Sequence, residues 1–149
     1  MLGANMSIVE FHHGVSDKLA YACRLLRKAY RAGAQVVVTG DVAALKALDR
    51  QLWVFDDREF VPHVLAQSEG AVPVRQHGTP IWLTADPASA PGERSVLVNI
   101  GQAMPPGVER FARLFDIVSN EMADRQQGRL RWKSYAAKGW QVNPHEVKE

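Results

Sequence analysis

The stretch AQVVVTG, residues 34–40, is an unbroken run centred on three valines and followed by an acidic residue. A strand with one buried face alternates apolar and polar residues, whereas a strand covered on both faces reads as a continuous apolar run. Strands of the second kind belong to parallel sheets that lie between layers of helices. This stretch therefore predicts the central strand of a layered α/β fold.

Helical patterns flank this central strand on both sides. From Asp17 to Ala32, apolar residues recur at helical spacing, and Gly33 stands where a helix commonly ends. Asp41 is expected to cap a second helix that runs to about Trp53. The segment from Met6 to His12 is short and β-prone, and a turn follows it. The order strand, helix, strand, helix is typical of an α/β protein.

Three further strands and a third helix complete the expected fold. The strand-like runs are residues 79–85, 95–101 and 114–118. Either Ser119 or Asn120 is expected to cap a final helix that extends to about Lys138. Residues 54–63 follow neither the helical nor the strand period, so we expect an ordered surface connection there. The prediction is about five strands and three main helices in a single α/β domain spanning residues 1–149.

The composition is that of an ordinary folded domain with little excess charge. The chain has 149 residues, of which 46% are hydrophobic and 23% charged, and its formal net charge is +2. This surplus is too small for wholesale wrapping by nucleic acid, although it leaves room for a local basic patch. Cys23 is the single cysteine, which excludes an internal disulfide and a thiolate metal cluster. We find no signal-peptide pattern and no segment near the roughly 20 apolar residues of a membrane span, so we expect a cytoplasmic protein that does not engage membranes.

The chain lacks the usual motifs of catalysis. The loops after the first two strands contain neither G-x-G-x-x-G nor a P-loop, and Asp41 would occupy the helix amides that an anionic ligand needs. His12 and His13 are adjacent, so on a strand they point to opposite faces and do not bind one metal together. His63 and Cys23 have no neighbouring motif that would make either of them part of a nucleophilic site. We therefore expect no catalytic residue, no metal and no cofactor.

The last helical segment concentrates positive charge. Residues 125–140, RQQGRLRWKSYAAKGW, hold five basic side chains and no acid. At about 100° per residue, four of the side chains share one arc of the helix; they are Arg125, Arg129, Trp132 and Lys133. A neighbouring apolar face, formed by Met122, Leu130 and Ala137, is expected to lie on the sheet. The resulting stripe could bind the phosphates of a single strand, with Trp132 as a stacking platform, or a peptide carboxylate held by arginine forks.

Three groups of residues resemble a known family over nearly the whole chain. They are LW…EFVPH at residues 52–63, R-x-x-x-R-x-x-W-K-x-Y at residues 125–135, and the pair Gly139 and Trp140. Together with the order of elements, they are similar to the chi subunit of bacterial DNA polymerase III holoenzyme. The resemblance implies a non-catalytic accessory subunit of the clamp loader. It also implies a Rossmann-like three-layer fold, with a mostly parallel sheet flanked by helices and no nucleotide-binding loop.

The resemblance further implies two partner surfaces. The first would bind the acidic, phenylalanine-ended C-terminal tail of single-stranded DNA-binding protein, through Arg125, Arg129, Trp132 and Lys133. The second would bind the psi subunit of the clamp loader, or a helicase at the same surface, through Trp53 and Phe60. DNA would then be contacted only indirectly.

Two other functions remain compatible with the residues themselves. One is a module that binds single-stranded nucleic acid directly through the same basic-aromatic helix. The other is a degenerate α/β hydrolase or nucleotide enzyme, which would need polar groups such as His12 or Asp41 to converge at the strand ends.

Overall fold

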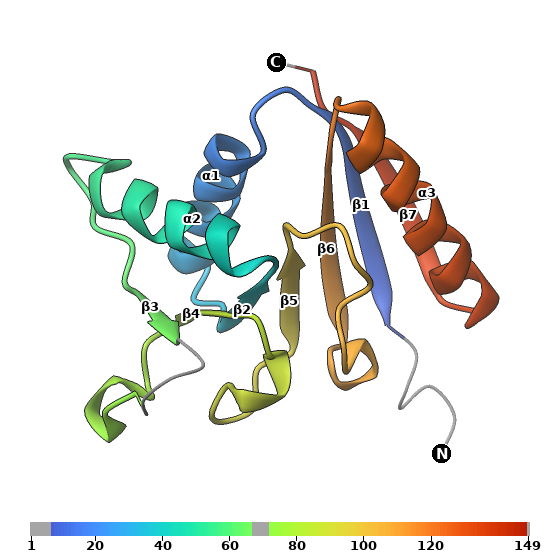
Figure 1. Ribbon diagram of the computed structural model, residues 1–149. Coiled ribbons are helices and arrows are strands. Elements are labelled where there is room, and N and C mark those ends of the chain that lie inside the picture. Colours follow the sequence, from blue (N-terminus) through green and yellow to red (C-terminus); the bar gives the residue numbers. More distant parts are fainter. Residues whose placement is uncertain (1–6, 67–71, 149) are drawn as a thin grey trace.

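The computed structural model describes residues 7–66 and 72–148 and contains a seven-stranded sheet. The strands are β1 (Ile8–Val15), β2 (Val36–Thr39), β3 (His63–Ala66), β4 (Ile81–Thr84), β5 (Val96–Asn99), β6 (Arg113–Ser119) and β7 (Gln141–Glu146). Their order across the sheet is β3-β4-β2-β5-β6-β1-β7, and every neighbouring pair is parallel (Figure 1). The α/β fold class and its parallel sheet are thereby confirmed.

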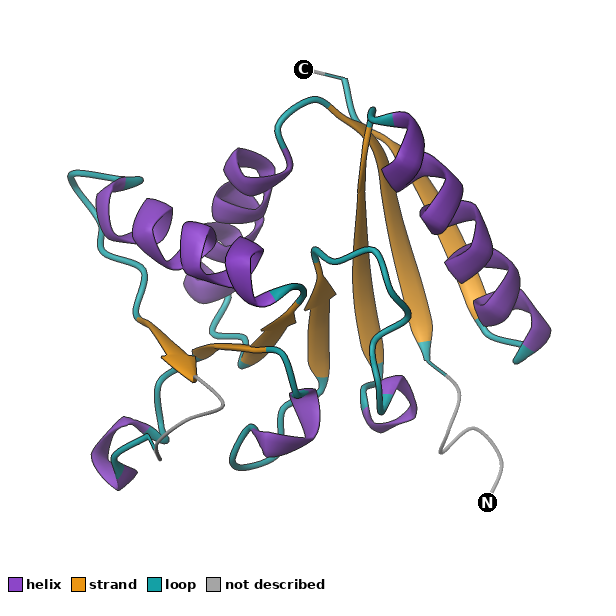
Figure 2. Cartoon of the chain, viewed as in Figure 1, coloured by secondary structure: helices purple, strands orange, loops and turns teal. Residues whose placement is uncertain are grey.

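Three helices cover the two faces of this sheet. They are α1 (Lys18–Arg31), α2 (Val42–Val54) and α3 (Met122–Ala137). Helices α1 and α2 pack on one face, and α3 packs on the other face over β6, β1 and β7 (Figures 1 and 2). This arrangement of helices, sheet and helix is the three-layer architecture of Rossmann-like folds.

Strand β2 is buried on both of its faces. Val36 and Val38 belong to the core beneath α1 and α2, which includes Leu26 and Leu48. Val37 points to the opposite face and belongs to a second core, formed mainly by apolar residues that pack with Tyr135 and Trp140. The continuous apolar run of this strand therefore reflects two separate hydrophobic cores, as the sequence predicts.

The structure has two strands more than the sequence predicts, and both lie at sheet edges. Strand β7 carries exposed or half-exposed residues along its whole length, so it lacks the apolar pattern by which a strand is recognised. Strand β3 is only four residues long and follows directly on the irregular connection after α2. Met6 and residues 67–71, which are part of the long connection between β3 and β4, lie outside the described residues.

The first helix begins and ends where its sequence predicts. The side chain of Asp17 accepts a hydrogen bond from the Ala20 amide at 3.1 Å, and Gly33 adopts the left-handed conformation at φ +79°. The third helix differs, because Glu121 precedes its first residue in the capping position instead of Ser119 or Asn120. The Ser119 amide donates instead to the carboxylate of Asp124 at 2.7 Å, inside the first turn.

The face of α3 that lies on the sheet is polar, which corrects the sequence-based expectation. Met122 and Leu130 are 74% and 55% exposed, and Ala137 is exposed as well. The residues of α3 that are buried are Asp124, Gly128, Arg131 and Tyr135. A helix normally buries its apolar stripe, so an inward-facing arginine requires a partner in the sheet.

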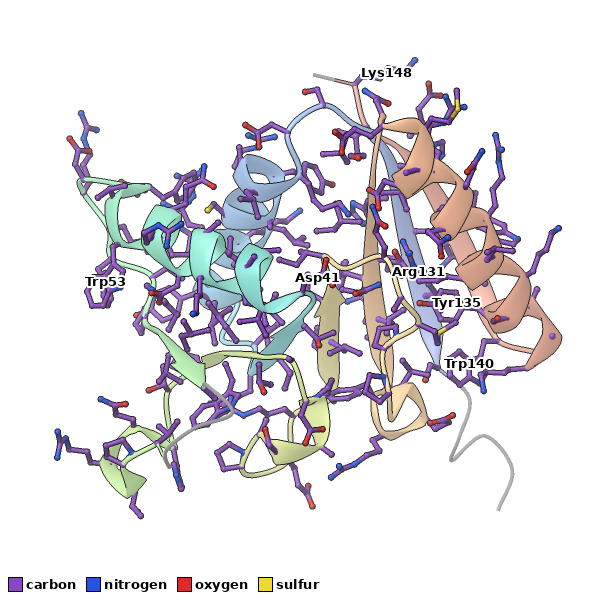
Figure 3. All side chains as sticks on the ribbon, viewed as in Figure 1. Asp41, Trp53, Arg131, Tyr135, Trp140 and Lys148 are labelled. Carbon is purple, nitrogen blue, oxygen red and sulfur yellow. The ribbon has the colours of Figure 1, made fainter. Side chains whose placement is uncertain are left out.

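That partner is Asp116 of β6, which is fully buried beneath α3. The Arg131 guanidinium donates to both carboxylate oxygens at 2.9 Å, and the Tyr135 hydroxyl donates to Oδ2 at 2.7 Å. Figure 3 labels Arg131 and Tyr135 on α3. Arg131 also donates to the carbonyl of Gln102. Burial opposes the charge of Arg131, but the bonds to Asp116 outweigh it and raise the pKa of the guanidinium. Burial, together with Asp116, raises the pKa of Tyr135, so the hydroxyl remains a donor.

We predict that Arg131→Met destabilises the fold by about 3–5 kcal/mol, because it leaves Asp116 charged and buried without its bidentate partner. The matched control is Arg129→Met, two residues away on the exposed side of the same helix. We expect that control to change the free energy of unfolding by less than about 0.5 kcal/mol. Urea titrations followed by circular dichroism compare the two variants. Equal stabilities would contradict a structural role for the buried pair.

Candidate functional site

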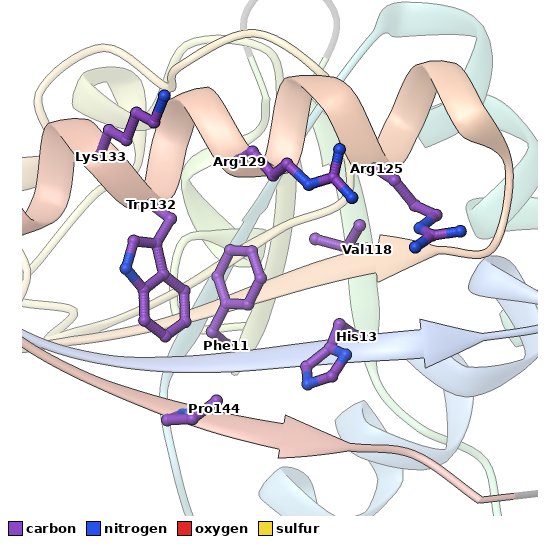
Figure 4. Close-up of a pocket in the computed structure, with 8 residues that line it drawn as sticks. All are labelled: Phe11, His13, Val118, Arg125, Arg129, Trp132, Lys133 and Pro144. Atoms are coloured by element: carbon purple, nitrogen blue, oxygen red, sulfur yellow. The ribbon is translucent and has the colours of Figure 1, made fainter.

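A pocket of about 470 Å³ lies between α3 and the strands beneath it (Figure 4). It is lined by Phe11, His13, Val118, Arg125, Arg129, Trp132, Lys133 and Pro144. We call it the basic-aromatic pocket. It brings together all four α3 residues that the sequence singles out as one stripe. The strands supply the other four residues, which come from β1, β6 and β7.

The floor of the basic-aromatic pocket is apolar. Phe11 and Val118 are almost fully buried, and Pro144 lies beside Phe11 on the neighbouring strand. The Trp132 ring is half-buried and stands edge-on to Phe11, with ring centroids 4.9 Å apart and an interplanar angle of 86°. This T-shaped contact is a favourable aromatic geometry, and it holds the indole as one wall of the pocket.

Gly128 lets α3 approach the sheet closely enough to form this floor. A Cβ atom at this position would lie 2.9 Å from a methyl group of Val118 and 3.5 Å from the Phe11 ring. Glycine in the middle of a helix costs about 1 kcal/mol relative to alanine, so close packing is the physical reason for its presence here. The same two side chains that Gly128 touches form the bottom of the pocket.

The rim of the pocket carries three cationic side chains. Arg125, Arg129 and Lys133 are exposed, and none has a side-chain hydrogen bond or ion pair among the described residues. The other two basic residues of the segment 125–140 have such partners. Arg131 is bound to Asp116, and the Lys138 ammonium lies 3.4 Å from Glu109. Three of the five charges are thus available to an anion from outside.

His13 also lines the pocket, although the sequence pattern does not identify it as part of this site. The structure confirms that the His12 and His13 rings lie on opposite faces of β1. His12 packs with Tyr21 on the α1 face, whereas His13 lies near Phe11 on the α3 face. The sequence shows only that two adjacent histidines on a strand face opposite sides of the sheet. It does not show which of them faces the basic helix.

The carboxyl ends of the strands, where α/β proteins commonly bind ligands, border another pocket of about 440 Å³, and internal contacts tie several of its polar side chains. The Lys18 ammonium pairs with Asp124 at 2.7 Å and donates to the carbonyl of Ile100 at 3.1 Å. Gly40 and Gly101 approach so closely that a Cβ on Gly101 would lie 2.9 Å from the Gly40 Cα. Asp41 stands in the capping position before α2, but its side chain makes no capping hydrogen bond, so the prediction that it occupies the helix amides is wrong.

The described residues contain no cluster of three or more histidine, cysteine or acidic side chains suited to a metal ion. Cys23 is buried, and burial raises the pKa of its thiol to about 11, which keeps it protonated near neutral pH. Burial also lowers the pKa of His12 to about 4, helped by the neighbouring His145. Burial therefore favours the uncharged forms of both Cys23 and His12.

A second cluster of exposed aromatic residues lies at the other end of the sheet. Trp53 at the end of α2 is 60% exposed and Phe60 is 47% exposed, and their ring centroids are 5.0 Å apart. The buried His63 ring packs against both, at 5.1 Å and 5.7 Å. We call these three residues the aromatic cluster. The structure therefore brings together the two residues that the sequence singles out there.

Ion pairs hold the connection that carries Phe60. The Arg27 guanidinium of α1 lies 3.0 Å from the carboxylate of Asp56, and Arg31 pairs with Glu59. Asp56 also accepts a hydrogen bond from the Arg58 amide at 2.9 Å. The connection is ordered by these contacts, as expected for residues 54–63.

Known proteins match this chain over most of its length. The family model described as DNA polymerase III chi subunit, HolC, matches residues 6–143. The chain belongs to the chi subunit family. The chi subunit of Pseudomonas aeruginosa is 33% identical over 133 residues, which is 89% of this chain and 88% of that protein. The chi subunit of Haemophilus influenzae is 30% identical over 128 residues, 85% of each chain.

The chi subunit of Escherichia coli is 26% identical over 131 residues, or 87% of this chain and 86% of that protein. Chi subunits are non-catalytic accessory subunits of DNA polymerase III. The aromatic cluster falls within the matched residues, as does the basic-aromatic pocket except for Pro144. No helix among the described parts of this chi-family chain has the length and apolar character needed to span a membrane.

We predict that Gly128→Ala destabilises the chain by about 1–2 kcal/mol, although alanine is the better helix former. The added methyl group would press on Val118 and displace α3 from the sheet. Ser134→Ala, at an exposed position of the same helix, should change the stability by less than about 0.5 kcal/mol. Chemical denaturation measures both. A Gly128→Ala protein more stable than the wild type would show that close packing is not the constraint.

Proposed function

We propose that this chi-family chain tethers the DNA polymerase III clamp loader to single-stranded DNA-binding protein by holding that protein's acidic C-terminal tail in the basic-aromatic pocket. The observation that carries the proposal is the combination of three unpaired cations, among the described residues, with an apolar floor. A tail that is acidic and ends in phenylalanine has the matching chemistry, because it offers carboxylates and one apolar ring at the end of a flexible chain.

The pocket suggests how such a tail would be held. Its last aromatic side chain would pack on Phe11 and Trp132, where the floor is apolar. The terminal carboxylate and the acidic side chains would then lie among Arg125, Arg129 and Lys133, with the arginines able to make bidentate contacts. Neither the rim cations nor the apolar floor would suffice alone, since exposed ion pairs contribute little and a single ring buries little area.

The expected affinity follows from these contacts. Charge-assisted hydrogen bonds contribute about 1.5–3 kcal/mol each, against the cost of ordering a flexible tail. The balance predicts a dissociation constant on the order of 1 μM, or about −8 kcal/mol. Since the cations are exposed, salt should weaken the binding. Several tails on one oligomeric partner would raise the avidity without any new contact.

We further propose that the aromatic cluster joins this subunit to a psi-type subunit of the clamp loader, or to a helicase at the same surface. The Trp53 and Phe60 rings contact each other at a tilt and are both largely exposed, which is typical of an interface centre. The contact would be mainly apolar and would resist salt. A protein with these partners works at the replication fork, so we expect it in the cytoplasm of a bacterium.

The first test is titration of the protein with a fluorescent synthetic peptide that copies the tail of its own organism's single-stranded DNA-binding protein. We predict a micromolar dissociation constant at low salt and weaker binding at raised salt. In Arg129→Ala the dissociation constant should rise by about tenfold or more. Arg110→Ala, an exposed arginine outside the pocket, is the matched control. If the peptide does not bind while a single-stranded oligonucleotide does, the chain is a direct nucleic-acid-binding module and the proposal fails.

The second test concerns the aromatic cluster. We predict that Trp53→Ser removes binding to a purified psi subunit, because an exposed ring at an interface centre contributes about 2 kcal/mol or more. Tail-peptide binding should not change, since the pocket lies over other strands. Val74→Ser removes an apolar side chain that is 80% exposed elsewhere and serves as the control. Undiminished psi binding in Trp53→Ser, measured by analytical gel filtration and calorimetry, would refute this role.

A further inference from the structure

We propose that His13 is a fourth anion-contacting side chain of the basic-aromatic pocket and that its protonation strengthens the binding of an acidic tail as the pH falls. This inference rests on the proposed function and adds a residue and a form of regulation to the same site. Histidine is suited to this role because it changes charge between about pH 5 and pH 8.

The position of His13 brings it to the pocket from the side opposite to the arginines. It follows Phe11 by two residues on β1, so both side chains lie on the α3 face, with ring centroids 6.3 Å apart. Figure 4 shows the imidazole beneath Arg125 and Val118, across the hollow from the helix. The ring is half-buried, and among the described residues it makes no side-chain hydrogen bond or ion pair. Its nitrogens are therefore available to a bound carboxylate.

The charges around His13 make its protonation depend on the ligand. From α3 it is faced by the three rim cations. From β7 the register neighbour is Glu146, an exposed acid that lies outside the lining of the pocket. On β6 the facing residue is the apolar Val118. Tail carboxylates placed among the cations would bring negative charge next to His13, which favours proton uptake by its ring on binding.

The remaining histidines of the chain lie away from the pocket. His12 has a pKa of about 4 and stays neutral between about pH 6 and pH 8. His145 contacts Glu10 at 2.6 Å on the opposite face of the sheet, His63 belongs to the aromatic cluster, and His77 packs on Trp82. Of the five histidines, His13 is the one that lines the pocket, so the pH dependence of tail affinity between about pH 6 and pH 8 tests this side chain. Aspartate and glutamate side chains of the peptide remain ionised throughout this range.

The experiment is calorimetric titration with the same acidic, phenylalanine-ended peptide at about pH 6 and pH 8 and constant ionic strength. We expect roughly three- to tenfold tighter binding by the wild type at the lower pH, and nearly equal binding at both in His13→Asn. His145→Gln, which removes a histidine from the other face, should keep the wild-type dependence. Wild-type titrations in buffers of different ionisation enthalpy should also show proton uptake on binding, an observation that needs no variant.

The outcomes separate this inference from the proposed function. Peptide binding that is lost in Arg129→Ala but is equally strong at both pH values would overturn the role of His13 and leave the tether intact. A His13→Asn protein that kept the wild-type pH dependence would overturn that role in the same way. Absence of peptide binding at either pH would overturn the proposed function and the inference with it.

Discussion

The buried contact between Arg131 and Asp116 is the constraint on which the arrangement of this molecule depends. Because the guanidinium must reach a carboxylate inside the sheet, it fixes the rotation of α3 about its own axis. Tyr135, one turn further along, donates to the same carboxylate and points the helix in the same direction. At about 100° per residue, turning position 131 inward turns positions 129 and 133 outward. An ion pair that contacts no ligand therefore determines which cations the helix presents.

The contact also explains how a basic segment can be both structural and functional. Arg131 and Arg129 are the same residue type, two positions apart. Arg131 is 2% exposed and bound to Asp116 and Gln102, whereas Arg129 is exposed and has no side-chain partner among the described residues. Gly128 adds the second condition, since the pocket floor forms only where the helix lies close to Val118. The rotation and the depth of α3 are thus fixed by different residues, and the basic-aromatic pocket requires both.

The two surfaces lie toward opposite edges of the sheet. The pocket is built on β6, β1 and β7, whereas the aromatic cluster lies beside β3, the strand at the other edge. Figure 3 shows Trp53 far from Arg131 and Tyr135, with the body of the sheet between them. The proposed tether requires partners at both surfaces at once, and this separation leaves room for the two. At the carboxyl edge of the sheet, Lys18 and Asp124 line a further pocket but are paired with each other, whereas the three rim cations of the basic-aromatic pocket have no ion pair among the described residues.

The sequence by itself determined the α/β class, the central strand, the helix boundaries at Asp17 and Gly33, and the grouping of Arg125, Arg129, Trp132 and Lys133. These features follow from local periodicity and from spacing along one helix, which a chain carries wherever it folds. Only the tertiary structure decided that Arg131 is buried while Leu130 is exposed, that β3 and β7 complete the sheet, and that His13 faces the pocket. In each case the deciding partner is distant in the sequence: Asp116 for Arg131, β4 and β1 for the edge strands, and α3 for His13. Hydropathy ranks side chains by their cost of burial in the absence of a partner, and so predicts that leucine is buried before arginine. The buried Asp116 carboxylate supplies that partner and reverses the order for Arg131 and Leu130.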